Sequence, residues 1–243
     1  MRILVMSDIH ANYNALEAVL KDAGQVDETW CLGDLVGYGP DPNAVVEEVR
    51  EIKNLTCLMG NHDVAVIGRM SLETFNGDAK RSLMYHEQVL SASNMDFIRS
   101  LPSQPKVRSE ATIVHGSPRD PLWEYILNST TASLNFDHFD TDVCFVGHTH
   151  IQCSFTLKER TGQVAAEHAK PDAALPLHPK VILNPGSVGQ PRDRDPRAAY
   201  AIYDTEARTW TPKRVMYDIA DVQNRIREAG LPEKHAARLA EGW

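Results

Sequence analysis

The sequence opens with a short apolar run that passes directly into polar residues, Ile3-Leu4-Val5-Met6-Ser7-Asp8-Ile9-His10. A continuous apolar run of this length is typical of a strand buried on both faces of a sheet. Similar runs recur along the chain, and most of them also stop at a polar, glycine-rich tip. They lie at residues 29–32, 55–59, 111–114, 143–146 and 181–183, and two more strand-like runs follow at 198–203 and 214–217.

Helical patterns lie between the first of these runs. Residues 14–23 carry one apolar stripe and end before Gly24, a residue type that commonly ends helices. Residues 43–52 follow Pro42 and carry a second apolar stripe. The alternation of strands and helices at this spacing predicts an α/β fold with helices on both faces of the sheet.

Three further segments complete the predicted organisation. Residues 64–101 contain no strand-like run and have a helical pattern, so we expect an insertion beside the candidate site. The arginine-rich stretch 190–197 (QPRDRDPR) is a loop by composition. We therefore expect a main domain over residues 1–218, which includes the insertion, and a helix–turn–helix tail over residues 219–243.

The composition is that of an ordinary globular protein, with 243 residues, 42% hydrophobic and 24% charged. The formal net charge of −8 argues against nucleic acid or an acidic membrane as the main partner, since both require a basic face. A small anionic substrate is compatible with this charge, because bound metal ions can invert the local field. The sequence does not indicate an oligomeric state.

The four cysteines are expected to be buried, reduced thiols. They are Cys31, Cys57, Cys144 and Cys153, and they form no CxxC pair. The first residues do not resemble a signal peptide, and no stretch approaches the roughly 18 apolar residues of a membrane-spanning helix. The predicted location is the cytoplasm.

The polar residues at the strand ends belong to one chemical kind: carboxylates, imidazoles and an amide. In an open α/β sheet, ligands bind beyond the carboxyl ends of the strands, so we expect these tips to converge. Such donors suit Mn, Fe, Zn, Co or Ni. Two pairs of them lie two residues apart, and in extended chain the members of a pair point the same way. The tips read Asp8-x-His10, Gly33-Asp34, Gly60-Asn61-His62-Asp63, His115-Gly116 and Gly147-His148-Thr149-His150.

With these motifs in this order, the sequence resembles the calcineurin-like metallophosphoesterase superfamily. The resemblance extends to about residue 190, and Asn184-Pro185-Gly186-Ser187 is similar to a segment of its smaller bacterial, phosphodiesterase-type members. It implies a four-layer α/β/β/α sandwich of two packed sheets. It also implies two divalent metal ions, the first held by Asp8, His10 and His150, the second by Asn61, His115 and His148, and both bridged by Asp34.

The resemblance also implies a reaction, the hydrolysis of a small phosphorylated substrate by direct attack of a hydroxide that bridges the two ions. His62 follows a ligand in sequence and is the candidate general acid, and Asp63 is the candidate group that orients it. The candidate substrate-binding residues are Asn61, His62 and Arg192. The remaining polar candidates are expected at the surface or in packing, and they are His86, His138, His168, His178, Arg194 and Arg197. The alternatives are that His86 faces the cleft and that Arg194 and Arg197, like Arg192, reach the substrate phosphate.

One departure from the family pattern bears on the substrate. Ser/Thr protein phosphatases of the superfamily carry Asp-Arg-Gly after the Gly-Asp motif, and its arginine helps to hold phosphate, whereas Asp34 is followed here by Leu35-Val36-Gly37-Tyr38. Two divalent ions, the carboxylates of Asp8 and Asp34 and one hydroxide give the centre a net charge of about +1. Without the additional arginine, this charge favours phosphodiesters, which carry one negative charge, over dianionic monoesters. The alternatives are a protein phosphatase or dinucleoside polyphosphatase of the same superfamily, and a non-catalytic scaffold, which the complete ligand set disfavours.

Overall fold

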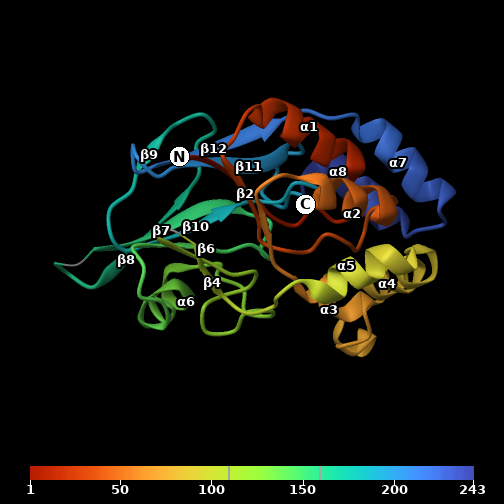
Figure 1. The fold of residues 1–243 in the computed structure, drawn as a ribbon, viewed down its shortest axis with the longest axis horizontal. Coiled ribbons are helices and arrows are strands. Elements are labelled where there is room, and N and C mark those ends of the chain that lie inside the picture. The colour runs from red at the N-terminus through yellow and green to blue at the C-terminus, as the bar shows by residue number, and fades with distance from the viewer. Residues whose placement is uncertain (109, 159) are drawn as a thin grey trace.

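Two six-stranded mixed sheets form the centre of the computed structural model, which describes residues 1–108, 110–158 and 160–243 (Figure 1). The first sheet has the order β3 (Leu55–Cys57), β2 (Glu28–Cys31), β1 (Arg2–Met6), β11 (Ala198–Asp204), β12 (Thr209–Val215) and β9 (Leu175–Pro176). The second has the order β4 (Lys106–Arg108), β5 (Ala111–Ile113), β6 (Val143–Phe145), β10 (Val181–Pro185), β7 (Gln152–Lys158) and β8 (Gln163–His168).

The three apolar layers of the core define how the elements stack. Side chains of both sheets meet between them, where the rings of Trp30 and Phe145 pack edge to face with centroids 5.9 Å apart. Helices α1 (Tyr13–Ala23) and α2 (Pro42–Glu51) cover the outer face of the first sheet. The short helix α6 (Ser129–Ser133) and the 3-10 turn η2 (Phe136–His138) cover the outer face of the second. The predicted four-layer α/β/β/α sandwich is confirmed.

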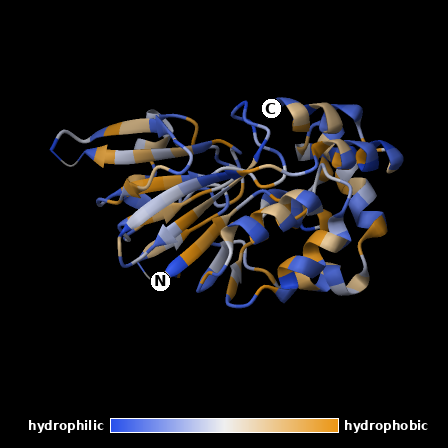
Figure 2. Cartoon of the chain, turned by 90° about the horizontal axis from the view of Figure 1, so that it is seen from above, coloured by the Kyte–Doolittle hydropathy of each residue, from blue (hydrophilic) through white to orange (hydrophobic). Residues whose placement is uncertain are grey.

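Helices α1 and α2 each bury one apolar face, and this is the feature that the apolar stripes in the sequence indicated. Figure 2 shows hydrophobic and hydrophilic residues alternating along the helices, as expected where one face is buried. In α1 the side chain of Asn12 caps the first turn by accepting from the amide of Ala15, 3.2 Å away. In α2 a proline occupies the first turn, where its missing N–H costs nothing. Both helices match their predicted ranges to within one residue at each end.

The strands were predicted less completely than the helices. All eight apolar runs contain or overlap strands, but the last begins earlier, as β12, than the predicted residues 214–217. The strands β4, β7, β8 and β9 were missed. The residues of β4, β8 and β9 are exposed or only partly buried. In β7, polar residues interrupt the apolar sequence. The edge strands β4, β8 and β9, and β7 next to β8, therefore lack the continuous apolar run that marks a doubly buried strand.

The predicted insertion and the predicted tail are helical and contact each other. Residues 64–101 include the end of α3 (Asn61–Val66), the turn η1 (Leu72–Thr74), α4 (Gly77–Val89) and α5 (Ala92–Ser100). Residues 219–243 form α7 (Ile219–Glu228) and α8 (Glu233–Glu241). Tyr85 of α4 packs against the apolar cluster between α7 and α8. The domain boundaries themselves stay predictions.

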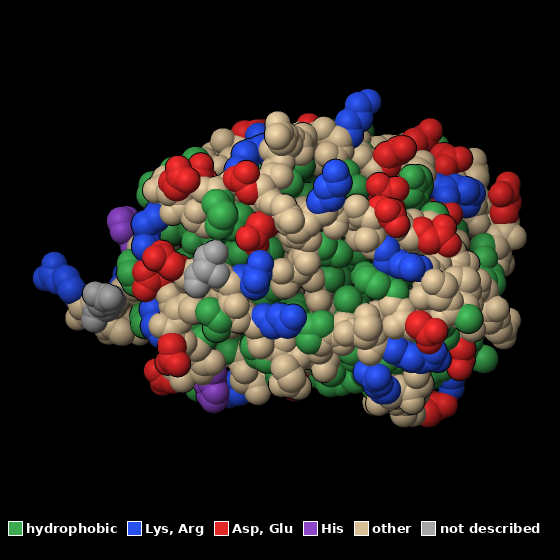
Figure 3. Space-filling view, viewed as in Figure 1, with side chains coloured by type: hydrophobic (Ala, Val, Ile, Leu, Met, Phe, Trp, Pro, Cys, Tyr) green, Lys and Arg blue, Asp and Glu red, His purple; other side chains and the backbone are tan. Residues whose placement is uncertain are grey.

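The surface and the cysteines can be compared with the composition. All four cysteines are free and buried, as expected. On the face seen in Figure 3, acidic and basic side chains are interspersed. Within residues 1–108, 110–158 and 160–243, no helix has the length and apolar character needed to cross a membrane.

Candidate metal centre

The structure gathers the candidate ligands at the carboxyl ends of strands from both sheets. Asp8 and His10 follow β1, Asp34 follows β2 and Asn61 begins α3 just after β3. His115 follows β5, and His148 and His150 follow β6. Each of these side chains is at most 2% exposed. The predicted convergence of the strand ends is therefore present, and it joins the two sheets at one buried place.

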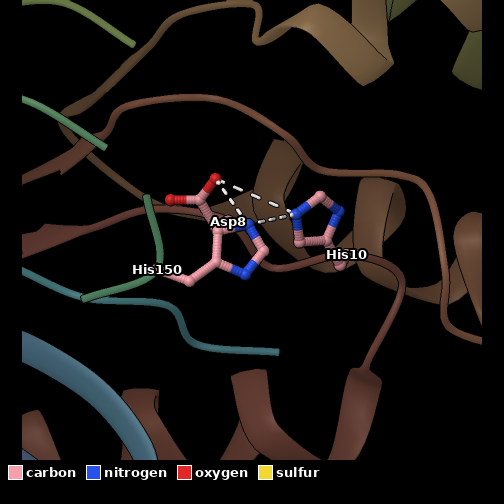
Figure 4. Close-up of side chains that lie close together, drawn as sticks. All are labelled: Asp8, His10 and His150. Atoms are coloured by element: carbon pink, nitrogen blue, oxygen red, sulfur yellow. Dashed lines mark hydrogen bonds and ion pairs between the residues drawn. The ribbon is translucent and has the colours of Figure 1, made fainter. Parts of the chain in front are cut away.

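One group consists of Asp8, His10 and His150 (Figure 4). The Nε2 atoms of His10 and His150 lie 3.0 Å apart. The Oδ1 atom of Asp8 lies 3.4 Å from His150 Nε2 and 3.8 Å from His10 Nε2. Ligand bonds of about 2.0–2.2 Å to one ion place neighbouring donor atoms roughly 3–3.6 Å apart, so this spacing suits a shared metal ion.

A second group consists of Asn61, His115 and His148. The Nε2 atom of His115 lies 3.2 Å from Asn61 Oδ1 and 3.2 Å from His148 Nδ1. Asp34 stands between the two groups, because its Oδ2 atom is 3.5 Å from His115 Nε2 and 3.6 Å from His10 Nε2. This is the arrangement that a bridging carboxylate requires.

The tautomers of the histidines test whether a cation fits. His10 Nδ1 lies 2.8 Å from the carbonyl of Val36, and His150 Nδ1 lies 2.6 Å from that of Gln190. A carbonyl only accepts, so each Nδ1 carries the proton and each Nε2 presents a lone pair. Two lone pairs and the buried Oδ1 of Asp8, which lacks a hydrogen-bond partner, then face one another. Such an all-acceptor cluster is satisfied by a metal ion.

The electrostatics of the centre lead to the same conclusion. Burial, and then the charge of His150, lowers the pKa of His10 well below its usual value, so this imidazole stays neutral and able to bind a cation. Burial, and then the charges of Asp63 and Asp8, raises the pKa of Asp34 well above its usual value. A neighbouring cation would favour the ionised form of Asp34.

The backbone at the ligands differs from the predicted extended chain. The φ angles are +55° at Asp8, +49° at His10, +65° at His148 and +60° at His150. Left-handed conformations cost on the order of 1–3 kcal/mol at such residues and persist where the surroundings impose them. The expectation that His148 and His150 point the same way was wrong, since the turn sends them to different groups.

Hydrogen bonds between loops hold these turns in place. The amide of His10 donates to the carbonyl of Asp34 at 3.0 Å, and the amide of His148 donates to Asp8 Oδ2 at 3.0 Å. Gly60 has no room for a side chain, because a Cβ there would overlap the carboxylate of Asp34. The ligand loops therefore fix one another across the sheet ends.

His62 lies beside the two groups. Its ring packs against those of His10 and Tyr38, with centroids 4.9 and 4.7 Å away. Its Nδ1 atom is buried without a hydrogen-bond partner and faces Gly37, whose φ of +96° and lack of a Cβ make room for the ring. Burial, and then the charge of Arg192, lowers the pKa of His62 well below its usual value. One ring nitrogen of His62 also lies within 4.8 Å of ligand atoms of His10 and Asp34.

Asp63 was predicted to orient His62, but its hydrogen-bond partners are backbone amides. Its Oδ1 atom accepts from the amides of Leu35 and Val36 at 2.9 and 3.2 Å, and its Oδ2 atom accepts from the amide of Gly60 at 3.0 Å. None of its described hydrogen bonds goes to His62. The carboxylate instead ties the loop after Asp34 to the start of α3.

The loop after Asp34 is also held by α4, which belongs to the insertion that the sequence predicted beside the site. His86 is buried, with Nδ1 accepting from the amide of Gly37 at 3.0 Å and Nε2 donating to the carbonyl of Gly39 at 2.8 Å. Ser82 accepts from the amide of Tyr38 at 3.1 Å. His235 of α8, which no motif marks, packs edge-on against Tyr38 at 5.0 Å. The insertion and the tail thus support the loop that carries Tyr38.

The three arginines of the 190–197 loop have different surroundings. The guanidinium of Arg192 lies over the ring of Tyr38, 5.5 Å from its centroid, and its charge contributes to the lowered pKa of the site histidines. Arg194 lies over Trp243 instead, and Arg197 pairs with Asp195. Of these arginines, Arg192 is the one beside the centre. The other three histidines assigned to the surface, His138, His168 and His178, are exposed.

A buried cluster of carboxylates and imidazoles at the strand ends of a two-sheet sandwich defines the class as a metallohydrolase fold. The family description "calcineurin-like phosphoesterase superfamily domain" matches residues 1–208. The chain therefore belongs to the calcineurin-like phosphoesterase superfamily, whose members are hydrolases of phosphoric esters.

Individual relatives agree with this assignment. A metallophosphoesterase from Sphaerobacter thermophilus of known structure is 49% identical and superposes with a TM-score of 0.92 over 100% of this chain and 99% of that chain. An uncharacterized protein of Methanocaldococcus jannaschii is 36% identical, with 99% of this chain and 98% of that protein covered. A symmetrical bis(5'-nucleosyl)-tetraphosphatase of Buchnera aphidicola is 30% identical over 131 residues, which are 51% of this chain and 47% of that protein.

The buried His86 leads to a prediction about pH. Burial lowers its pKa in the fold from 6.5 to about 4. Below pH 6.5 the unfolded chain takes up a proton that the folded chain does not, so stability falls as the pH drops toward 4, by up to about 3 kcal/mol from this group. Urea unfolding of the metal-free protein should show a smaller loss over this range for His86→Gln.

Exposed His138 provides the control, because His138→Gln should leave the pH profile of stability unchanged. Parallel profiles for wild type and His86→Gln would show that His86 does not titrate as its burial requires.

Proposed function

We propose that the protein is a phosphodiesterase that depends on two divalent metal ions. Asp8, His10 and His150 would hold one ion, Asn61, His115 and His148 the other, and Asp34 both. When bound, the ions supply Lewis-acid activation of water and of the phosphoryl group. Mn, Fe, Zn, Ni and Co all suit these donors.

The observation that carries the choice of a diester is that, among the residues that the structure describes, few cations lie around the centre. Tyr38 lies against His10 and His62, and Phe75 and Tyr125 lie against His62 and His148. Arg192 is the cation whose charge acts on the site histidines. A diester carries one negative charge and two organic groups, which this aromatic and weakly cationic surrounding can accommodate.

The remaining residues have roles in substrate binding and proton transfer. Arg192 would bind a non-bridging phosphoryl oxygen, with Asn61 and His62 completing the contacts. His62 is neutral in the free protein because its pKa is low. An anionic phosphoryl group beside it would favour its charged form, so that Nε2 can deliver a proton to the leaving oxygen. Asp63 would act indirectly, by holding the loop that shapes the pocket of His62.

Hydrolysis of dinucleoside polyphosphates is a second candidate. It is supported by the partial similarity to the Buchnera tetraphosphatase. Arg238 of α8 adds a further cation near Arg192, since burial and then the charge of Arg192 lower its pKa. A polyphosphate chain would need both arginines, whereas a simple diester would need only Arg192.

Metal removal tests the dinuclear centre. Chelation should abolish diester hydrolysis, and Mn²⁺ or a similar ion should restore it, with about two ions bound per chain. Asp34→Ala should lose both ions, because Asp34 Oδ2 stands between the two groups. Asp137→Ala, at an exposed aspartate, is the matched control and should retain them. Full activity in the metal-free protein would contradict the proposal.

Substitution of His62 tests the general acid. His62→Ala should retain both ions yet lose on the order of 10²–10⁴ in rate with an alkoxide leaving group. The loss should be smaller with nitrophenolate, which leaves without a proton. His138→Ala should leave both rates unchanged. Loss of metal, or equal losses for both leaving groups, would exclude this role for His62.

A pair of substrates tests the diester preference. With the same metal, kcat/KM should be higher for bis-p-nitrophenyl phosphate than for p-nitrophenyl phosphate. Arg192→Ala should lower kcat/KM by about tenfold to hundredfold, and more for the doubly charged monoester. Arg194→Ala, in the same loop but over Trp243, is the control. A tenfold preference for the monoester would show that the charge argument is wrong.

A further inference from the structure

Three aromatic side chains outside the ligand set form a connected row beside the centre. Tyr125 stacks on the ring of His148, with centroids 3.9 Å apart and an angle of 22°. Trp123 meets His148 edge-on at 6.3 Å and Phe75 at 5.3 Å. Phe75 meets the ring of His62 edge-on at 4.9 Å. This aromatic arc, Phe75, Trp123 and Tyr125, therefore runs from the proposed acid to a proposed ligand of the second ion.

The arc lies between the buried centre and solvent. His148 is 2% exposed, whereas Tyr125 is 43% exposed and Phe75 and Trp123 are half-buried. Phe75 packs against a hydrophobic cluster, but in the described part of the chain Trp123 and Tyr125 belong to none. Their positions are thus not explained by burial in the core.

The loop that carries Trp123 and Tyr125 is held in one conformation. Glu124, between them, accepts from Ser117 Oγ at 2.7 Å and from Asn135 Nδ2 at 2.8 Å, and it also pairs with Arg119. Asp120 accepts from the amide of Trp123 at 3.2 Å. These bonds hold Glu124 against the body of the protein while both aromatic rings contact His148. A binding surface fixed in advance loses little entropy when a ligand arrives.

The chemistry of the arc selects a flat, uncharged, partly polar group. Among the described residues, the arc itself offers rings and no charge, and the nearest cations are Arg192, whose charge acts on Tyr125, and Arg119, which is paired with Glu124. An aliphatic chain would gain little from ring faces that remain partly hydrated. A nucleobase stacks on such rings whatever its sequence identity. The arc begins directly beside the centre, because Tyr125 stacks on His148 and Phe75 packs against His62. A base linked through a sugar to a phosphoryl group at the centre would therefore lie next to it.

We infer that the aromatic arc is a nucleobase subsite, and that the substrate is a nucleoside phosphodiester. This inference rests on the proposed phosphodiesterase activity and specifies its substrate class. Stacking on Trp123 and Tyr125 would position the sugar and the phosphoryl group for reaction. The arc is then a specificity determinant of the centre rather than part of its chemistry.

A matched pair of diesters tests the inference. Thymidine 5'-(p-nitrophenyl phosphate) and methyl p-nitrophenyl phosphate share the leaving group and the single negative charge, and differ in the nucleoside. The expected kcat/KM is about tenfold to hundredfold higher for the thymidine ester. Equal values would overturn the inference but leave the phosphodiesterase proposal intact. If neither ester is cleaved, the phosphodiesterase proposal is contradicted. The binding experiment with thymidine 5'-monophosphate would then decide whether the arc binds a nucleobase.

Variants separate stacking from a structural role. Trp123→Leu and Tyr125→Leu should each lower kcat/KM for the thymidine ester about tenfold more than for the methyl ester, mainly through KM. Trp123→Phe should retain most of the preference. Trp243→Leu, at another exposed tryptophan, should change neither ester. Equal losses for both esters would show that the arc only supports the centre, and would overturn the inference.

Binding without turnover gives an independent result. Trp30 and Trp210 are fully buried, so in Trp243→Leu protein Trp123 is the tryptophan that a ligand can reach. Thymidine 5'-monophosphate should quench the fluorescence of this protein saturably when it is loaded with Zn²⁺, and inorganic phosphate should not. The absence of quenching by the nucleotide, or equal quenching by phosphate, would overturn the inference even if the leucine variants fail to fold.

Discussion

The rest of the structure depends on one constraint, the burial of many hydrogen-bond acceptors that face each other with no donor between them. The protons of His10 and His150 are committed to backbone carbonyls, so their free nitrogens meet Asp8 across about one coordination sphere. Unsatisfied acceptors of this kind are costly to bury. A cation bound between these acceptors would satisfy them, and the fold positions them around such a site.

That constraint explains the unusual backbone around the centre. Ligands drawn from strands of two sheets must turn sharply as soon as each strand ends, and left-handed residues make these turns. Asp8 and Asp34 are candidate ligands, and they also accept hydrogen bonds from loop amides. Asp8 accepts from the amide of His148, and Asp34 accepts from the amide of His62. The strain of the loops is therefore balanced by bonds that also orient the carboxylates.

The insertion and the tail extend this support outward. Helix α4 holds the backbone around Tyr38 through Ser82 and His86, and α8 brings His235 against the Tyr38 ring. Phe75, in the same insertion, begins the aromatic arc that continues through the loop of Trp123. Parts of the chain that carry no catalytic motif thus shape the surroundings of the candidate metal centre.

The sequence by itself determined an α/β fold, two outer helices and the set of candidate ligands, because doubly buried strands and polar strand ends leave strong local patterns. The four layers and the two sheets followed from the family resemblance and not from periodicity. Local pattern also marked Arg192 as a candidate, although only its packing over Tyr38 distinguishes it from Arg194. The inner strand β7, the edge strand β8, the partners of Asp63 and the divergence of His148 from His150 were decided by the tertiary structure. Each depends on contacts between residues distant in sequence or on backbone turns imposed by neighbouring loops. The same holds for His235 and the aromatic arc, whose members become neighbours of the centre only when the insertion, the 116–128 loop and the tail pack around it.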